Sequence, residues 1–291
     1  MADNATAVED RIEVRIEAIT GRRPVSLSPL AGGCIGQVLR VDFSDGVPLV
    51  AKLGGADSRL DQEGGMLTYL AAHSRLPVPD VISAEPDLLL MSYLEGRGVL
   101  GPEAEVHAAE LLADLHEVHA DQFGFGTATQ IGGLVQPNPW ADDWVGFFAE
   151  QRLIYMGRQA LKASRLPGAV FARLEIFAGH LNRWLTTEFR PSLIHGDMWG
   201  GNVLCQGGRI AGFVDPAIYF ADREIELAFA TLFNTFGPAF FEAYQGRRPL
   251  APGFFEERRD IYNLYPLLVH VRLFGGSYVA SVETSLARFG F

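Results

Sequence analysis

The pattern of apolar residues changes near residue 96, and this change restricts the folds open to the chain. Before it, short apolar runs bounded by turn residues predict strands, with one long helical stretch over 57–73 among them. After it, helical spacing dominates, and only 192–215 interrupts it with strand-like pieces. The pattern predicts an α+β fold of two lobes: a small, strand-rich lobe over 1–95 and a larger, mostly helical lobe over 96–291.

The same spacing places the elements of each lobe. In the first lobe we expect an amphipathic opening helix, two strands within 25–45, and further strands over 48–53, 78–82 and 88–93. In the second lobe we expect helices over 102–120, 140–155, 168–189 and from 223 onward. The glycine-bounded segment 92–98 joins the lobes, and ligands of two-lobe proteins prefer the cleft between them.

The composition narrows the functions open to the chain. Of 291 residues, 48% are hydrophobic and 20% charged, which is enough apolar material for a core and excludes a disordered chain. The formal net charge of -11 argues against nucleic acid or an anionic membrane as the partner and suits cationic small molecules. No apolar run approaches the roughly 18 residues of a spanning helix, and the acidic start lacks an apolar signal segment. Two cysteines cannot build a disulfide framework, so we expect a soluble cytoplasmic protein.

An Asp–Asn–Asp constellation lies within the strand-like pieces of the second lobe. Asp197 follows an apolar strand, Asn202 comes five residues later, and Asp215 ends another strand. The intervening Gln-Gly-Gly-Arg reads as a hairpin turn, which would bring Asn202 and Asp215 side by side. Oxygen ligands of this kind suit Mg²⁺ shared with substrate phosphates, and Asp197 is then free to accept a proton from a substrate hydroxyl. The alternative is a pair of unrelated surface turns with Asp and Asn as turn formers.

The first lobe contains residue types that bind the phosphates of a nucleoside triphosphate. Lys52 lies inside a strand, where a solvated lysine is unusual, and Glu63 follows on the helical stretch at a spacing that brings its carboxylate back to the ammonium. Upstream, Gly32, Gly33 and Gly36 lie between two strands, where the backbone can approach phosphates closely. Taken singly, an edge-strand lysine, a solvated glutamate and an ordinary hairpin are the favoured explanations of these residues. Their order along the chain favours phosphoryl transfer.

This order resembles the protein-kinase-like fold in its small-molecule kinase branch, and more narrowly the fructosamine (ketosamine) kinase family. The likeness runs over most of the chain, and its most specific part is the Asp-x-Trp-x-Gly-Asn core. It is carried by 193–203, 215–217 and 219–224, while 240–244, 253–254 and 262–265 look like the family's C-terminal helices.

The resemblance implies ATP and Mg²⁺ as cofactors and a role for each matching residue. Asp197 is implied as the proton acceptor, Asn202 and Asp215 as magnesium ligands, Lys52 and the glycine loop as phosphate ligands, and the backbones of Ser92, Tyr93 and Leu94 as adenine ligands. The implied reaction is phosphorylation of the 3-hydroxyl of ketosamines, free or as glycated lysine side chains. In this family the 3-phosphate decomposes and frees the amine, so the reaction is read as deglycation.

Two departures from protein-kinase patterns define the expected acceptor. Gly196 occupies the position at which many protein kinases have an arginine that binds a phosphate group on the activation loop. Only residues 216–221 separate Asp215 from the next expected helix, which is too short for a peptide-docking loop. We therefore expect a small molecule or an exposed side-chain adduct as acceptor, and a monomer or homodimer that needs no activating phosphorylation.

Several other residues have both a functional and a structural interpretation. Trp199 is a candidate to pack on the substrate through its indole ring, or to lock the catalytic loop as a core residue. Cys34 is either a redox-sensitive thiol or a small residue in a turn, and Cys205 is expected to be buried and inert. For the remaining candidates the structural interpretation is favoured: His116 and His119 as a helical pair, His195 as a support of the catalytic loop, Asp142 and Asp143 as caps, and the charged cluster 222–226 as a buttress.

Two other function classes stay open at this stage. An aminoglycoside- or choline-type kinase shares the His-x-Asp-x4-Asn pattern, although the Trp-Gly-Gly insert favours ketosamines. A nucleotide-binding pseudokinase that acts as an interaction module is disfavoured, because the five chemistry-bearing residues Lys52, Glu63, Asp197, Asn202 and Asp215 are all present.

Overall fold

A computed structural model describes residues 12–30, 36–96, 98–186 and 188–291. The first lobe is a five-stranded sheet of order β1-β2-β3-β5-β4, antiparallel at every pairing. Its strands and helices are β1 (Pro24–Pro29), β2 (Gln37–Phe43), β3 (Leu49–Leu53), β4 (Val81–Glu85), β5 (Leu88–Ser92), the short 3₁₀ turn η1 (Ala56–Ser58), α2 (Leu60–His73) and a helical segment over 12–20.

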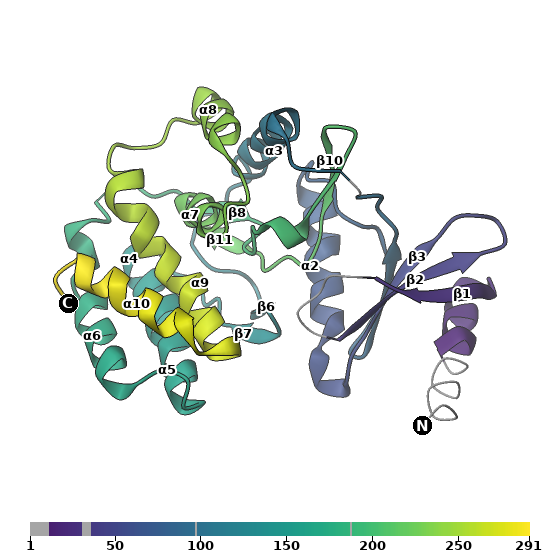
Figure 1. Ribbon diagram of the computed structural model, residues 1–291, viewed down its shortest axis with the longest axis horizontal. Helices are drawn as coiled ribbons and strands as arrows, with labels where there is room; N and C mark the ends of the chain where they lie inside the picture. Colours follow the sequence, from purple (N-terminus) through teal and green to yellow (C-terminus); the bar gives the residue numbers. More distant parts are fainter. Residues whose placement is uncertain (1–11, 31–35, 97, 187) are drawn as a thin grey trace.

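Side-chain alternation along the strands determines which helix covers which face of this sheet. Leu49 and Ala51 of β3 pack with Ile16 of the opening helix, on the side of the sheet away from the second lobe (Figure 1). Val50, one residue out of phase, packs with Leu67 of α2 on the other side. Lys52 has the same parity as Val50, so β3 directs it toward α2 and the second lobe.

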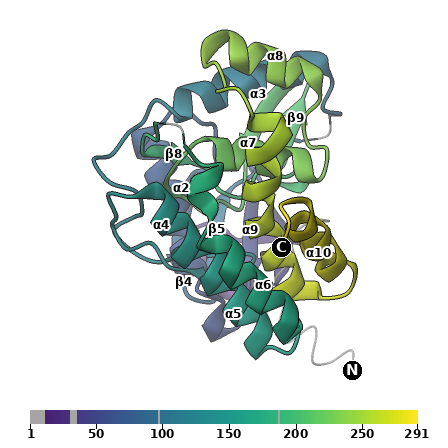
Figure 2. The same ribbon diagram turned by 90° about the vertical axis from the view of Figure 1, so that its left-hand side faces the viewer.

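The second lobe is built around the buried helix α9, which packs against α5, α7 and α10 (Figure 2). Its helices are α3 (Pro102–Leu115), α4 (Trp144–Phe147), the π-helix η2 (Phe148–Ile154), α5 (Tyr155–Lys162), α6 (Gly168–Ala178), η3 (Leu181–Arg183), η4 (Gly200–Asn202), α7 (Glu224–Leu232), α8 (Pro238–Arg247), the π-helix η5 (Phe254–Arg258), α9 (Arg259–Phe274) and α10 (Ser277–Arg288). Three two-stranded sheets complete it: β6 (Thr129–Ile131) with β7 (Leu134–Gln136), β8 (Ser192–Ile194) with β11 (Tyr219–Ala221), and β9 (Val203–Gln206) with β10 (Arg209–Phe213).

The predicted α+β fold with a strand-rich first lobe and a helical second lobe is confirmed, while the exact division at residues 95 and 96 stays a prediction. The expected hairpin between Asn202 and Asp215 is present as β9–β10, with Gly207 and Gly208 both at positive φ in its turn. In the part of the chain that the structure describes, no helix combines the length and apolarity needed to cross a lipid bilayer.

Some boundaries differ from those that the periodicity predicts. The helix expected over 168–189 ends at Ala178, because the chain tightens into the 3₁₀ turn η3 while Leu181 and Leu185 continue the apolar spacing. The helix expected over 102–120 ends at Leu115, after which the chain turns and pairs with β8 through His119. The strand expected at 78–82 begins only at Val81.

Candidate active site

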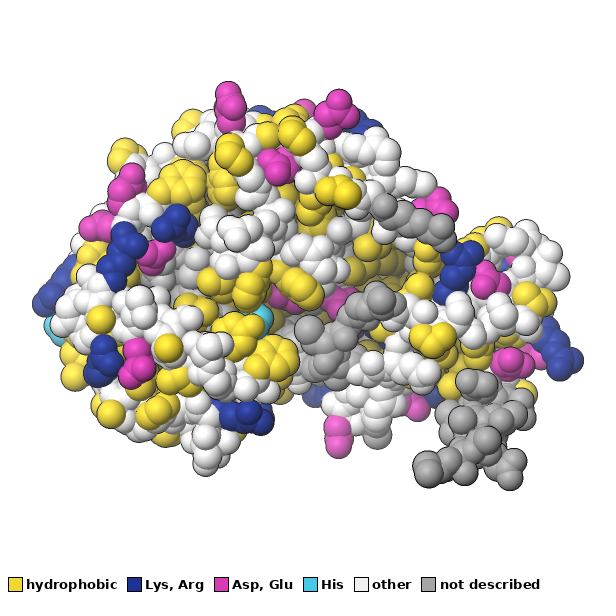
Figure 3. Space-filling model, in the orientation of Figure 1, with side chains coloured by type: hydrophobic (Ala, Val, Ile, Leu, Met, Phe, Trp, Pro, Cys, Tyr) yellow, Lys and Arg dark blue, Asp and Glu magenta, His cyan; other side chains and the backbone are white. Residues whose placement is uncertain are grey.

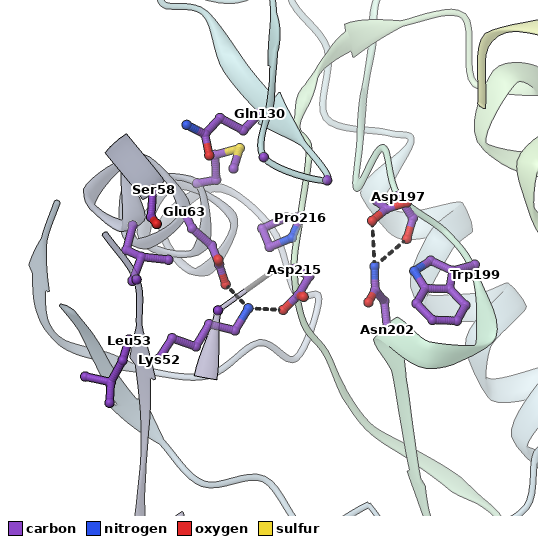
Figure 4. A pocket seen from close by; sticks show the side chains of 16 residues that line it. Lys52, Leu53, Ser58, Glu63, Gln130, Asp197, Trp199, Asn202, Asp215 and Pro216 are labelled. Atoms are coloured by element: carbon purple, nitrogen blue, oxygen red, sulfur yellow. Dashed lines mark hydrogen bonds and ion pairs between the residues drawn. The ribbon is translucent and has the colours of Figure 1, made fainter. Parts of the chain in front are cut away.

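A lysine from the first lobe and an aspartate from the second meet in the cleft. Lys52 on β3 donates to Glu63 Oε1 of α2 at 2.6 Å and forms a second ion pair with Asp215 just after β10 (Figure 4). Only 8% of Lys52 is exposed. Asp215 has a φ of 56°, in the left-handed region that a residue other than glycine rarely adopts. Strain of this kind persists where the surroundings hold it, which is common at functional sites.

The charges of Lys52 and Glu63 are shielded from water, and Asp215 is half-buried beside them. Burial alone would lower the pKa of Lys52, but Glu63 and Asp215 reverse this effect and raise its pKa above the usual value. Burial raises the pKa of Glu63, and Lys52 opposes that rise. The lysine is therefore a fixed cation inside the cleft.

Asp197 and Asn202 form the second polar group of the cleft. Asn202 Nδ2 donates to Asp197 Oδ2 and to the Asp197 carbonyl oxygen, both at 2.9 Å. This leaves the Asn202 Oδ1 as an acceptor that can turn toward a cation. Burial raises the pKa of Asp197 to about 7, while the Asn202 amide opposes that shift. A carboxylate with a pKa near neutrality is well matched to accepting a proton.

Buried contacts behind Asp197 hold the loop that carries it. Gly196 has a φ of 87°, and a Cβ there would lie 2.1 Å from the Ala217 carbonyl oxygen, so only glycine fits. The Gly196 amide donates to Glu226 Oε1 of α7 at 2.7 Å, and the other oxygen of Glu226 meets His116 Nε2 at 2.8 Å. His195 is fully buried with Nε2 3.1 Å from the Val214 carbonyl oxygen. Of the expected supports, Glu226 of the cluster 222–226 accepts from the Gly196 amide, and His195 Nδ1 accepts from the Asp197 amide at 3.4 Å.

Beside Lys52 lies a cavity of about 190 Å³ that reaches the segment joining the lobes. The expected Ser92, Tyr93 and Leu94 line it. The Ser92 amide already donates to the Asp80 carbonyl oxygen at 2.9 Å, so it is not free for a ligand. Apolar side chains from both lobes provide the walls: Leu30, Val38, Val50, Met91, Leu204 and Val214. A flat apolar base fits between such walls.

A second cavity, of about 520 Å³, opens on the other side of Asp197. Trp199 lines it, as expected of a residue that contacts substrate, and it also packs against the core. The remaining side chains are mainly apolar and aromatic: Ile131, Phe229, Phe233, Val269, His270, Leu273, Phe274 and Tyr278. Hydrophobic side chains likewise border the hollow between the lobes in Figure 3.

The β6–β7 hairpin and part of α2 also line the site, although no sequence motif above pointed to them. Gln130, Gly132 and Gly133 of the β6–β7 hairpin line the cavity that holds Lys52, Asp197 and Asp215. The Gly-Gly dipeptide between short apolar runs was the available signal for this hairpin. Ser58, Leu60 and Met66 line the same cavity, and no sequence motif marks them.

The other candidates take structural positions or cannot be placed. Gly36 lines the cleft, whereas Gly32, Gly33 and Cys34 lie outside the described residues. Cys205 is a buried free thiol, as expected. Asp143 caps α4 by accepting from two backbone amides, and Asp142 accepts from Gln122. His116 and His119 bind different partners, Glu226 and the Pro191 carbonyl oxygen, so they are not a ligand pair. Within the described ranges, no group of three or more His, Cys, Asp or Glu side chains is arranged to hold a metal ion.

The fold and this cleft define a phosphotransferase of the protein-kinase-like class. An aminoglycoside phosphotransferase in ternary complex with AMP-PNP and hygromycin B has the same fold, with a TM-score of 0.69 at 17% identity over 96% of this chain and 99% of that one. The family model for fructosamine kinase matches residues 10–289. The chain belongs to the fructosamine kinase family.

Relatives of known sequence and structure agree with this assignment. A probable ketoamine kinase of Synechocystis is 34% identical over 98% of both chains, and one of Vibrio parahaemolyticus is 34% identical over 78% of this chain and 79% of its own. The crystal structure of a candidate fructosamine-3-kinase from Thermobifida fusca superposes with a TM-score of 0.84 at 30% identity, covering 95% of this chain and 98% of that one.

Proposed function

We propose that the protein transfers the γ-phosphoryl group of ATP to the 3-hydroxyl of a ketosamine. Asp197 accepts the hydroxyl proton, the hydroxyl oxygen bonds to phosphorus, and the bond to the β-phosphate oxygen breaks to release ADP. The observation that supports this best is the direct Lys52–Asp215 ion pair across the cleft, beside Asp197. It brings a phosphate-binding cation, a carboxylate and a proton acceptor into one cavity.

The residues of the cleft suit a magnesium nucleotide. Asn202 Oδ1 and the Asp215 carboxylate supply oxygen atoms, the donors that Mg²⁺ prefers, and two protein ligands suffice where phosphates and water complete the shell. When bound, the ion would neutralise charge on the transferred phosphates. Lys52 and Gly36 would contact the phosphates, and Glu63 would orient Lys52. Tyr93 and Leu94 would hold the adenine, because the Ser92 amide is already engaged.

The acceptor cavity favours a ketosamine over a polycationic antibiotic. Asp197 is the one carboxylate among its lining residues in the described part of the chain, so several ammonium groups would lack partners. The aromatic rings of Trp199, Phe229 and Tyr278 suit a sugar ring face and a single secondary ammonium. Free ketosamines and glycated lysine side chains both carry these groups. A cytoplasmic location and a monomer or homodimer stay predictions.

The test is turnover on a small panel of fructose-, ribulose- and erythrulose-derived amines, with aminoglycosides alongside. We expect ADP release with the ketosamines and a phosphate on the 3-oxygen by NMR. The Asp197→Asn variant should keep nucleotide binding and lose about 10²–10⁴-fold in kcat. Near-normal turnover in that variant would refute the role of Asp197, and turnover on aminoglycosides alone would refute the proposed acceptor.

A further inference from the structure

The β6–β7 hairpin lies at the point where the nucleotide and acceptor cavities meet. Gly132, Asp197 and Trp199 line two cavities: the one that holds Lys52 and Asp215 together with Asp197, and the apolar acceptor cavity of about 520 Å³. Figure 4 shows Gln130 of this hairpin on the Glu63 side, with Asp197 and Trp199 across from it. The hairpin also packs against α2, the helix that carries Glu63. The transferred phosphoryl group must therefore pass next to this turn.

A side chain at residue 132 would meet Leu273, which lines the acceptor cavity. Gly132 and Gly133 both have positive φ, 53° and 70°, which gives the tight two-residue turn. A Cβ on Gly132 would lie 2.9 Å from Cδ1 of Leu273, a residue that lines the acceptor cavity. A side chain at 132 would therefore displace the end of the Leu273 side chain and change the width of the acceptor cavity that both residues line.

A fully buried polar network holds the base of the hairpin in place. Gln136 Nε2 donates to Thr129 Oγ1 at 2.8 Å and to the Ala217 carbonyl oxygen at 3.0 Å, while its Oε1 accepts from Tyr265 at 2.7 Å. Ala217 lies two residues after Asp215, so Gln136 ties the hairpin to the segment that carries this aspartate. Buried networks of this kind rigidify the elements they join.

We propose that the β6–β7 hairpin is a specificity element of the acceptor site, in which Gly132 packed on Leu273 sets the width available to the sugar end of the ketosamine and Gln136 fixes the turn relative to Asp215. The proposal rests on the proposed function. The acceptor it favours is an unbranched polyhydroxy chain or small ring that enters between Trp199 and the turn.

The experiment compares Gly132→Ala with a matched control that carries the same backbone strain. Gly207 is also at positive φ in a two-glycine hairpin turn, and a Cβ there meets nothing within 4 Å. We expect Gly132→Ala to raise the acceptor KM by about tenfold or more while the ATP KM stays within about twofold. Gly207→Ala should leave both constants within about twofold.

A second substitution tests the contact itself. Removing the opposing side chain in Gly132→Ala/Leu273→Ala should bring the acceptor KM back to within about threefold of the wild type. Should Gly132→Ala fail to fold, Leu273→Phe narrows the cavity from the other side without a substitution in the turn and should raise the acceptor KM alone.

The outcomes separate the two proposals. Suppose that the wild type turns over ketosamines. If Gly132→Ala and Gly207→Ala then change the acceptor KM equally, or if the double variant does not restore the acceptor KM, the role of the hairpin is overturned and the proposed function stands. A wild type that turns over no ketosamine overturns both.

Discussion

At the scale of single residues, Lys52 is the side chain on which the cleft depends most. It is buried between two carboxylates, so its removal leaves Glu63 and Asp215 facing each other without a cation. We expect Lys52→Met to lower kcat/KM for ATP by about 10²-fold or more, through lost phosphate binding and a displaced Asp215. Steady-state kinetics with varied ATP provide the measurement.

The control for this variant is Lys162→Met, the same chemical change at an exposed position at the end of α5. It should leave kcat/KM for ATP within about twofold, since exposed charges contribute little. An unchanged ATP dependence in Lys52→Met would show that the lysine does not contact the phosphates.

Residue spacing was sufficient to predict the Lys52–Glu63 contact, because both ends lie in one strand–helix unit and the geometry of that unit is local. It was also sufficient to predict the hairpin between Asn202 and Asp215, since the turn glycines specify it. The Lys52–Asp215 contact joins the two lobes, and the spacing of residues along the chain did not predict it. The cluster 222–226 was expected to support the catalytic loop, but which of its side chains contacts Gly196 depends on how α7 docks.

At the scale of elements, α7 acts as a support for the catalytic loop. Glu226 is 1% exposed and accepts from the Gly196 amide, which fixes the backbone one residue before Asp197. Glu226→Gln keeps the size but weakens this charge-assisted bond, so we expect kcat to fall about tenfold with the ATP KM nearly unchanged. Measurement of kcat and KM at saturating acceptor tests this split.

A neighbouring carboxylate on the same helix supplies the control for α7. Glu224 is also buried, but it pairs with Arg258 and does not touch the loop. Glu224→Gln should lower the Tm and leave kcat within about twofold. Equal losses of kcat in the two variants would mean that α7 matters only for stability.

Element boundaries show where periodicity stops being informative. The strands of the β6–β7 hairpin have three residues each, too few to display an alternation, and β11 is equally short. The π-helices η2 and η5 lie within or next to α-helices, and their extra residue per turn shifts the apolar stripe without a breaker that marks it. The strands β2, β3 and β5 and the start of α3 were predictable because their patterns extend over several alternations or turns.

At the scale of the whole molecule, the two-lobe fold was predictable from the order of the elements, because consecutive strands joined by short turns usually become neighbours in one sheet. The docking of the lobes was not encoded in this way. It depends on contacts between residues far apart in the chain, such as Tyr69 of α2 against Phe125, with ring centroids 4.9 Å apart. Such contacts become visible only once both lobes are folded.

The stability of the whole molecule should depend on pH through its buried histidines. His116 is fully buried, and burial lowers its pKa below the usual 6.5, although Glu226 opposes this. Burial lowers the pKa of His195 in the same direction. The folded state therefore resists protonation, while the unfolded state binds protons as the pH falls below 6.5. The contribution of each of these two histidines to the free energy of unfolding is thus retained above this pH and lost below it, by up to about 1.4 kcal/mol per pH unit.

Chemical denaturation between about pH 7.5 and pH 5.5 tests this dependence with His116→Gln, whose amide can still bridge Glu226 and Tyr244. Between these two pH values, we expect the free energy of unfolding of the variant to fall by about 1 kcal/mol less than that of the wild type, because one of the titrating groups is gone. His73→Gln, at the exposed end of α2, should follow the wild-type curve. Parallel curves for the wild type and His116→Gln would mean that His116 binds its proton equally well in the folded and unfolded states. Its burial between Glu226 and Tyr244 would then not contribute to the loss of the free energy of unfolding at acidic pH.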